Sequence, residues 1–353
     1  MHPVDACNRV RCDVRGAGGH YESWFARANH PSRPLAFWIR YTTFAPKGRP
    51  QDAVGEVWAI WFDGERGRHV ALKDTVPLAR CSIAARELDV RIGLSTLGTH
   101  QLEGRARGPG HTLRWQLGYA CDEQPLLLLQ RGWYDRGFPK AKSLVPCPNA
   151  QFYGRIAIDG VPVEIDGWRG SQNHNWGSRH TDRYAWGQVA GFDDDPHAFL
   201  ECATAWLKVG GVPLPALTVL VLRVDGRTHA FNGLAASMLR ATGRLRGTTW
   251  ELAARSPRAR VTARIEAAPE AFVALRYDNP PGGVKQCLNS KLASCVLTFS
   301  PKGEAPRTYV SRQRAAFEIL GDRLPEGLAA APLEATGGAH RRAAAAALPA
   351  DAH

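Results

Sequence analysis

The stretch from Gly170 to Asp195, GSQNHNWGSRHTDRYAWGQVAGFDDD, concentrates hydrogen-bonding and aromatic side chains in about two strands and a turn. In its first part, NHNWG, strand alternation places His174 and Trp176 on one face. Asn173 and Asn175 then lie on the other face. These side chains either fill a polar corner of a core or line a pocket.

The second part, YAWGQVAGF, has the same character. Tyr184, Trp186 and Gln188 share one face, and Gly187 and Gly191 lie on the opposite one. Glycines permit a close approach of backbone or a strong bend. The aromatic face is therefore typical of a pocket lining, although satisfied core aromatics remain the alternative.

Other chemistries find little support in the sequence. His174, His180 and His197 are available to a metal, and Asp193 to Asp195 form an acidic run, but their spacing matches no zinc pattern and DDDPH is typical of a turn. Neither G-x-S-x-G, G-x-G-x-x-G nor a P-loop occurs, so a serine triad and nucleotide cofactors lack an anchor. We expect no metal and no cofactor.

Composition sets broader bounds. The chain has 353 residues, of which eleven are Trp, and 45 Lys and Arg against 33 Asp and Glu give a net charge of +12. The basic residues are scattered, with no basic run typical of a nucleic-acid patch. The eight cysteines form no C-x-x-C pair, and the N-terminus lacks the apolar segment of a secretory signal. We expect a cytoplasmic protein that does not bind nucleic acid.

The elements that must position these residues are strands. LAFWIRYTTF (35–44) and VGEVWAIWFDG (54–64) are rich in aromatic and β-branched residues. Asp159-Gly160 and Asp225-Gly226 are two-residue turns of predicted hairpins. Strand-length segments between turn signals predict an all-β fold of sandwiches or barrels.

A composition break, FPKAKSLVPCPNAQ (138–151), suggests a domain junction. It divides the chain into β domains at 20–145 and 150–322, each long enough for a barrel of about eight strands that holds one small ligand. The Ala-rich segment 323–353 is predicted to be a disordered tail.

The motif NHNWG, followed by WGQVAGF, resembles the tocopherol cyclase and carotenoid hydratase (AttH-like) group of lipocalin-like proteins. YESWFARAN (21–29), the segment WLKVGGVPLPALTVLVLRVDGRTHAFN and the late strand CLNSKLASCVLTFS resemble further parts of that group. The resemblance implies two tandem antiparallel lipocalin-like β-barrel domains. It also implies chemistry at a carbon–carbon double bond of a prenyl or polyene chain, by hydration or cyclisation and without a redox cofactor.

Such chemistry requires a carboxylic acid that stays protonated near pH 7, and burial against Trp raises a carboxyl pKa. Glu22, near Trp24, and Glu201 are the candidate acids, and His174 is a candidate to orient the acid or activate water. Aromatic faces would stabilise a carbocation. The candidate substrate-binding residues are Trp24, Trp176, Tyr184, Trp186, Gln188 and Asn173.

One departure weakens the hydratase interpretation: several relatives carry an acidic residue where this chain has Asn173. Glu22 also has an ordinary alternative role as a surface ion-pair partner. The leading hypothesis is a cofactor-independent cyclase (isomerase) or hydratase (lyase) of isoprenoid or secondary metabolism. The alternative is a non-catalytic carrier of an apolar ligand. The expected partner is a hydrophobic small molecule; a peripheral membrane contact and the oligomeric state stay open.

Overall fold

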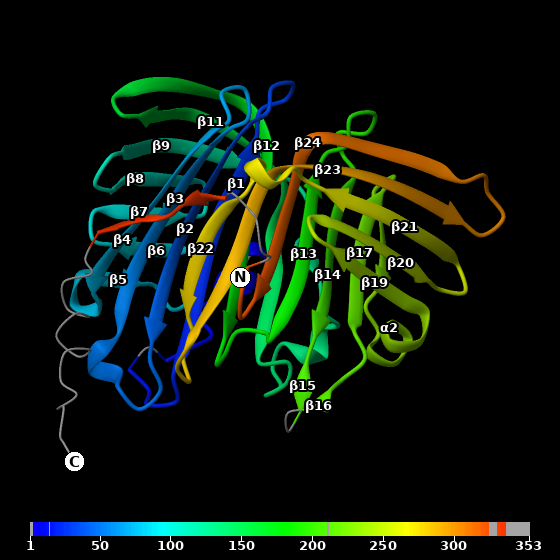
Figure 1. Cartoon of the computed structure of the whole chain (residues 1–353), viewed down its shortest axis with the longest axis horizontal. Helices are drawn as coiled ribbons and strands as arrows, with labels where there is room; N and C mark the ends of the chain where they lie inside the picture. Colours follow the sequence, from blue (N-terminus) through cyan, green and yellow to red (C-terminus); the bar gives the residue numbers. More distant parts are fainter. Residues whose placement is uncertain (1–2, 14, 210–211, 325–329, 337–353) are drawn as a thin grey trace, which may run out of the picture.

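The computed structural model describes residues 3–13, 15–209, 212–324 and 330–336. Two large sheets lie side by side along the long axis of the molecule (Figure 1). Every strand pairing within them is antiparallel except the pairings of two short strands near the C-terminus. The predicted all-β, antiparallel fold is confirmed. Among the described residues, no helix is long and apolar enough to cross a membrane.

The first sheet contains most of the N-terminal half of the chain. Its strands in spatial order are β26 (Glu334–Thr336), β4 (Arg68–Pro77), β3 (Val54–Asp63), β2 (Leu35–Ala45), β1 (His20–Asn29), β12 (Val161–Gly177), β11 (Ala141–Ile158), β9 (Thr112–Ala120), β8 (Gln101–Arg107), β7 (Ser95–Gly98), β6 (Asp89–Ile92) and β5 (Cys81–Ile83), and β10 (Leu126–Leu127) also pairs with β11.

The second sheet follows in sequence. Its spatial order is β18 (Arg227–Phe231), β17 (Leu217–Val224), β14 (Phe199–Trp206), β13 (Arg183–Ala190), β24 (Arg307–Gly321), β23 (Val284–Pro301), β21 (Ala259–Glu266), β20 (Thr249–Arg255) and β19 (Ala241–Arg246), with β22 (Val273–Asp278) between β23 and β25 (Ala331–Pro332). β15 (Lys208–Val209) and β16 (Val212–Pro213) form a separate small ribbon. The described α-helices are α1 (Pro3–Asn8) and α2 (Leu234–Arg240).

The two Asp-Gly turns form as predicted. Asp159 and Gly160 have φ values of 51° and 86°, and they join β11 to β12. Asp225 and Gly226, at 51° and 67°, join β17 to β18 in the same way. Two successive positive φ values are the signature of the type I′ turn, whose twist matches that of the strands it joins.

The change from one sheet to the other comes later than the composition break. The segment 138–151 leads into β11, and β11 pairs with β12 and β9 in the first sheet. The second sheet begins with β13, after Gly177. Two prolines of the break, Pro146 and Pro148, coincide with register shifts in β11 between Leu144 and Ala150, so they mark an irregular strand inside a sheet.

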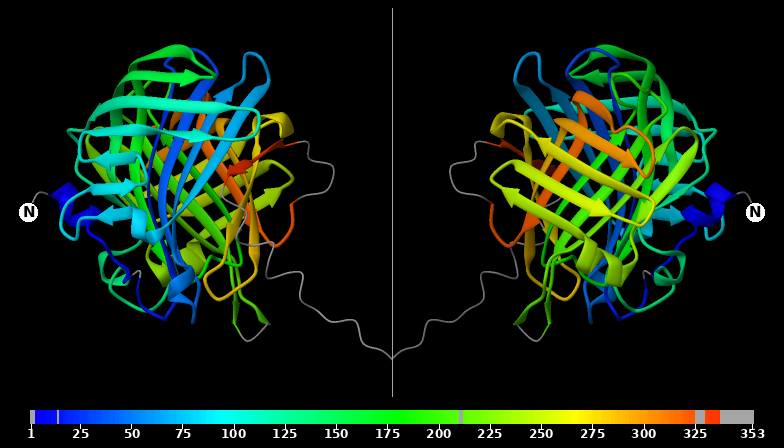
Figure 2. Two further views of the ribbon diagram at one scale, coloured as in Figure 1. Left: turned by 90° about the vertical axis from the view of Figure 1, so that its left-hand side faces the viewer. Right: turned by 90° about the vertical axis from the view of Figure 1, so that its right-hand side faces the viewer.

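The predicted disordered tail, 323–353, is corrected in part. β25 pairs in parallel with β22 of the second sheet, and β26 pairs in parallel with β4 of the first. Residues 325–329 and 337–353 lie outside the described residues. Figure 2 shows these strands on the side of the molecule opposite α1. The chain therefore returns from one sheet to the other at its C-terminal end.

Three apolar clusters explain which face of each strand matters. One cluster consists mainly of residues from the first sheet, and a second consists mainly of residues from the second sheet. A third cluster lies between the two sheets. β1 serves two of them: Trp24, Ala26 and Ala28 belong to the first cluster, and Phe25 belongs to the cluster between the sheets. Alternate residues of β1 therefore face different environments.

Candidate functional site

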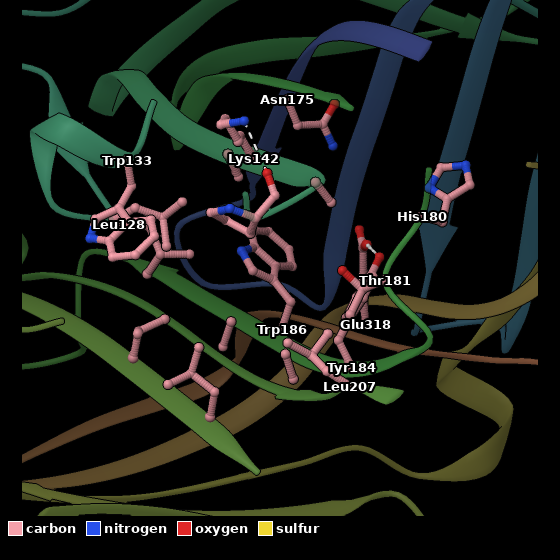
Figure 3. A pocket seen from close by; sticks show the side chains of 18 of the residues that line it. Leu128, Trp133, Lys142, Asn175, His180, Thr181, Tyr184, Trp186, Leu207 and Glu318 are labelled. Carbon is pink, nitrogen blue, oxygen red and sulfur yellow. Dashed lines mark hydrogen bonds between the residues drawn. The ribbon is translucent and has the colours of Figure 1, made fainter. Parts of the chain in front are cut away.

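A pocket lies between the two sheets (Figure 3). Its unoccupied volume is about 1350 Å³, counting solvent at its mouth. Its lining is mainly aromatic and aliphatic with a few polar groups, as in many small-molecule sites. The residues used below are Tyr21, Phe25, Trp38, Arg40, Leu128, Trp133, Lys142, Asn175, His180, Tyr184, Trp186, Ala203, Val219, Tyr277 and Glu318.

Strand register in the second sheet builds one wall of the pocket. Trp186 on β13 lies opposite Ala203 on β14 and Glu318 on β24. Ala203 in turn lies opposite Val219 on β17. Cross-strand partners present their side chains on one face of the sheet. Four strands therefore contribute one row of side chains to the wall of the pocket. Glu318 supplies the carboxylate of this row.

Sequence reasoning missed Glu318. Its carboxylate accepts hydrogen bonds from the Tyr184 hydroxyl at 3.2 Å and from Asn289 Nδ2 at 2.9 Å. The Lys291 ammonium donates to the same carboxylate at 3.1 Å and to Asn289 Oδ1 at 2.5 Å. Burial lowers the pKa of Lys291. The signal available in the sequence was a single carboxylate within the otherwise apolar run AAFEIL.

Glu201 lies one row deeper than the pocket wall. It is opposite Gln188, and it accepts hydrogen bonds from Trp186 Nε1 at 2.8 Å and Gln188 Nε2 at 2.7 Å. Its side chain is fully buried, and desolvation raises its pKa to about 7, against the lowering effect of those two hydrogen bonds. The expected surroundings of a protonated carboxyl, burial beside Trp, are present. Trp186 separates this carboxyl from the pocket.

The polar side chains beside Glu201 form hydrogen bonds that connect the two sheets. Arg27 Nε donates to Gln188 Oε1 at 2.8 Å, and the Ser171 hydroxyl donates to the same oxygen at 2.7 Å. Gln188 Nε2 also donates to Asn173 Oδ1 at 2.7 Å. Gln188 and Asn173, predicted to bind substrate, are buried in this network and do not line the pocket.

The raised pKa of Glu201 gives stability a pH dependence. Between about pH 4.5 and 7 the unfolded chain ionises this carboxyl while the folded protein keeps it protonated, so stability falls as pH rises through that window. Glu201→Gln, which cannot ionise, should lack this decline. Relative to wild type, the free energy of unfolding of the variant should increase by on the order of 2–3 kcal/mol between pH 4.5 and 8.

Urea titrations across that pH range measure the difference. The exposed Glu251→Gln on β20 is the matched control, and it should track the wild type. A difference between wild type and Glu201→Gln that stays constant with pH would contradict a raised pKa.

Four other predicted site residues lie on the opposite face of β1 and β12. Glu22 and His174 are fully buried and hydrogen-bonded, with His174 Nε2 2.9 Å from Glu22 Oε1. His174 stacks on Trp24 with ring centroids 4.9 Å apart and contacts Trp176 at 4.8 Å. Trp176 lines a separate hollow near Arg11 and Tyr134, so Trp176 and Trp186 do not share one pocket.

The Glu22–His174 pair holds the N-terminal segment. Glu22 accepts the backbone N–H groups of Arg11 at 2.8 Å and Cys12 at 3.0 Å. His174 Nδ1 lies 2.8 Å from the Cys7 carbonyl oxygen, so this nitrogen carries a hydrogen. Neither Glu22 nor His174 lines the pocket between the sheets. The arrangement gives both residues a structural role in fixing residues 7–12.

We therefore expect Glu22→Gln to loosen the N-terminal segment and to spare ligand binding. The Gln amide has one acceptor oxygen where Glu22 has two, so the buried network with Arg11, Cys12 and His174 loses a hydrogen bond, at a cost of about 1–3 kcal/mol of unfolding free energy. Limited proteolysis should cut near residues 9–13 faster than in wild type. A variant that keeps the wild-type cleavage rate but loses ligand affinity would reverse this assignment.

The end of the pocket near His180 carries a second set of residues that sequence reasoning did not connect. His180 is buried and stacks between Tyr21 at 4.2 Å and Tyr277 at 5.5 Å. Burial first, then the Arg40 charge, lowers the pKa of His180 to about 3, so the imidazole is neutral. The Arg40 guanidinium lies 4.9 Å from the Tyr277 ring centroid.

The acidic run has the predicted turn role. Asp195 Oδ1 accepts the backbone N–H groups of His197 at 3.0 Å and Ala198 at 3.1 Å. Asp193 pairs with Arg312 and Arg314. In the described part of the chain, no three or more His, Cys, Asp or Glu side chains are grouped as metal ligands would be.

Comparison with sequences gives relatives without a known role. No family model matches the chain. An uncharacterized protein of Mycobacterium tuberculosis strain H37Rv, Rv0493c, is 28% identical over 280 residues, which cover 79% of this chain and 81% of that protein. Its counterpart in strain CDC 1551, MT0513, matches equally well.

Comparison with solved structures confirms the fold expected from the resemblance. A putative AttH from Nitrosomonas europaea matches with a TM-score of 0.54 and 15% identity, over 87% of this chain and 93% of that one. Kievitone hydratase from Nectria haematococca matches with a TM-score of 0.54 and 11% identity, over 90% and 94%. CghA, solved with Sch210972, matches with a TM-score of 0.52 and 13% identity, over 92% and 96%. The chain thus shares the overall fold of these three proteins.

Proposed function

We propose that this protein is an enzyme that hydrates or cyclises a carbon–carbon double bond of a hydrophobic prenylated or polyene substrate, by acid assistance and without a cofactor. The observation that carries the proposal is the pocket between the sheets, whose aromatic wall contains the carboxylate of Glu318. One of the structural neighbours is named as a hydratase, which supports this class of reaction.

In the proposed reaction, the Lys291 ammonium passes a proton to the Glu318 carboxylate, and the resulting carboxyl hydrogen moves to one carbon of the double bond. The π electrons form the new C–H bond, the O–H bond breaks, and the other carbon becomes cationic. Phe25, Tyr184 and Trp186 supply aromatic faces to this cation, each contributing roughly 0.5–2 kcal/mol. Water then adds, or another group of the substrate closes a ring, and the hydrogen released returns to Glu318.

The surroundings of Glu318 support its role as the proton donor. The lowered pKa of Lys291 makes that ammonium a stronger acid, and it contacts Glu318 directly at 3.1 Å. Lys291 is therefore placed to give Glu318 its proton and to take back the hydrogen that returns to Glu318 at the end of each turnover. Glu201, linked to the pocket through Trp186, acts as a positioning residue.

Of the candidate acids from the sequence, Glu201 keeps an indirect role in this proposal. Glu22 and His174 have none, because both lie away from the pocket and are occupied by the N-terminal segment. Tyr184 and Trp186 remain as substrate-binding residues, since both line the pocket. Trp24 and Trp176 do not, because they pack around His174.

Turnover in deuterated water tests the proposal. The purified protein, without added cofactor, is incubated in D₂O with a panel of prenylated phenols and linear polyenes. Products are then analysed by mass spectrometry. Hydration adds one molecule of water, cyclisation leaves the composition of the substrate unchanged, and either route through a protonated alkene places deuterium on carbon.

Binding without any product would instead favour the carrier hypothesis. Product whose carbon skeleton carries no deuterium would contradict protonation of the double bond. A protein denatured by heat is the control for spontaneous conversion in both cases.

A further inference from the structure

Several buried polar atoms on the pocket lining have no hydrogen-bond partner among the described residues. They are Trp38 Nε1, Arg40 Nε, Tyr277 Oη and Asn175 Oδ1. Trp38, Arg40 and Tyr277 are each at most 5% exposed. The Cys287 thiol beside Tyr277 is only a weak hydrogen-bonding group. Buried polar groups without a partner are uncommon in folded proteins, so their concentration at one pocket suggests a ligand group that satisfies them.

Three of these groups lie within one subsite. Trp38 and Arg40 are two residues apart on β2, so their side chains leave the same face of the strand. The Arg40 guanidinium is 5.9 Å from the Trp38 ring centroid and 4.9 Å from that of Tyr277. An indole N–H, a guanidinium N–H and a phenol O–H can all donate. Together they form a cluster of donors around one cation.

The groups that contact the Arg40 guanidinium are uncharged side chains. Its Nη2 donates to the neutral Ser23 hydroxyl at 2.7 Å. The rings that the guanidinium contacts, those of Trp38 and Tyr277, are uncharged as well. A buried charge is costly unless it is paired. An anionic group on the ligand would supply a charged partner within the pocket.

The other ionisable groups considered on the pocket lining do not add a free negative charge beside Arg40. Glu318 is paired with Lys291. Lys142 adds a second cation, whose ammonium donates to the carbonyl oxygens of Arg136 and Pro139 at 2.8 and 2.9 Å. His180 is neutral. The pocket as a whole therefore attracts negative charge.

The opposite end of the pocket is apolar. In Figure 3, Leu128 and Trp133 lie on one side of Trp186, and His180 and Thr181 lie on the other. A ligand that fills both ends would have an apolar chain and a polar head. The polar head would lie on the side of Glu318 and His180.

We propose that the substrate is an amphiphile with an anionic oxygen head group, such as a carboxylate, which Arg40, Trp38 and Tyr277 bind while its apolar chain extends past Trp186. This inference rests on the proposed function, since it places the head group in the same pocket. Arg40 then fixes which double bond of the chain lies beside Glu318.

A pair of probes that differ only in the head group tests the inference. Farnesoic acid and farnesol share one prenyl chain, and their binding at pH 8 can be followed by quenching of tryptophan fluorescence. The wild type should bind the acid about tenfold or more tightly than the alcohol, the worth of one charge-assisted hydrogen bond. Arg40→Met should remove this preference and leave farnesol affinity within about threefold of wild type.

Two further variants complete the test. Tyr277→Phe, which deletes one hydroxyl, should weaken the acid alone by roughly three- to tenfold. The exposed Arg155→Met on β11 is the matched control, and it should behave as wild type. Retained farnesol binding shows that each variant is folded. The preference of the wild type for the acid is measured on the unmodified protein, so it does not depend on the folding of any variant.

Equal affinity of the wild type for acid and alcohol, or a preference that survives Arg40→Met, would overturn the inference. Either result leaves the proposed reaction at Glu318 intact. If the wild type binds neither probe, the pocket does not accept a prenyl chain, and both the inference and the proposed function fail.

Discussion

Glu318→Gln should lower the turnover number by roughly 10²–10⁴-fold, the usual worth of a positioned general acid. Glutamine keeps the size of the side chain, but its single acceptor oxygen can replace only one of the two carboxylate oxygens, Oε2 that accepts from Tyr184 or Oε1 that accepts from Asn289 and Lys291. It cannot deliver a proton to the substrate. Ligand affinity should therefore change by no more than a few-fold, and the loss should appear in kcat rather than in KM.

The measurement is steady-state kinetics on the first substrate that shows turnover. Glu201→Gln provides the comparison between a residue that touches substrate and a positioning residue. We expect it to lower kcat by about tenfold or less and to shift the pH profile, since the carboxyl with a pKa of about 7 is removed. If Glu318→Gln retains full kcat while Glu201→Gln loses it, the roles assigned to the two carboxyls must be exchanged.

Arg27→Met should lower the free energy of unfolding by about 3–5 kcal/mol, because it leaves buried partners without a donor. Arg27 is fully buried and donates to Gln188, to Asn29 Oδ1 at 2.8 Å and to the backbone of β13. These bonds join β1 of the first sheet to β13 of the second. The Arg27 charge also lowers the pKa of Glu201, so its removal should raise that pKa further.

Urea unfolding of wild type, Arg27→Met and the exposed Arg155→Met at pH 8, above the pKa of about 7 of Glu201, checks this expectation. The double variant Arg27→Met/Glu201→Gln should recover part of the loss, because it removes both members of a coupled pair of charges. A loss of unfolding free energy below about 1 kcal/mol for Arg27→Met would mean that the hydrogen bonds of Arg27 between the sheets contribute little to stability.

Local patterns predicted much of the fold. Alternation assigned the correct faces to His174 with Trp176 and to Tyr184 with Trp186, because a strand has a fixed two-residue period. Asp159-Gly160 and Asp225-Gly226 gave hairpins since only residues tolerant of positive φ fit such turns.

The sequence alone did not show which faces meet each other. β1 and β12 present one face to the interior of their own sheet and the other to the second sheet, and the two faces look equally polar and aromatic in sequence. Glu22 and Glu201 were therefore grouped although β1 separates them. The partner of Glu22, the N-terminal segment at Arg11 and Cys12, binds through its backbone, which carries no sequence signal.

Two residues of the site did leave a signal that was not used. Arg40 stands alone as a charge within LAFWIRYTTF, and Glu318 stands alone within AAFEIL. A charged side chain in an apolar strand is expensive to bury without a purpose. The two lie nearly 280 residues apart in the chain, and only the packing of the two sheets brings them to one pocket.

The C-terminal strands have a consequence for how the pocket is kept in shape. β25 of the C-terminal segment pairs with β22, whose Tyr277 lies in the subsite around Arg40, and β26 pairs with β4 of the other sheet. Residues 330–336 thus act as a clasp that ties the edge of one half to the edge of the other. Shortening the chain at Asp322 would open that clasp, and we expect the relative placement of Arg40 and Tyr277, rather than either sheet by itself, to be the first property affected.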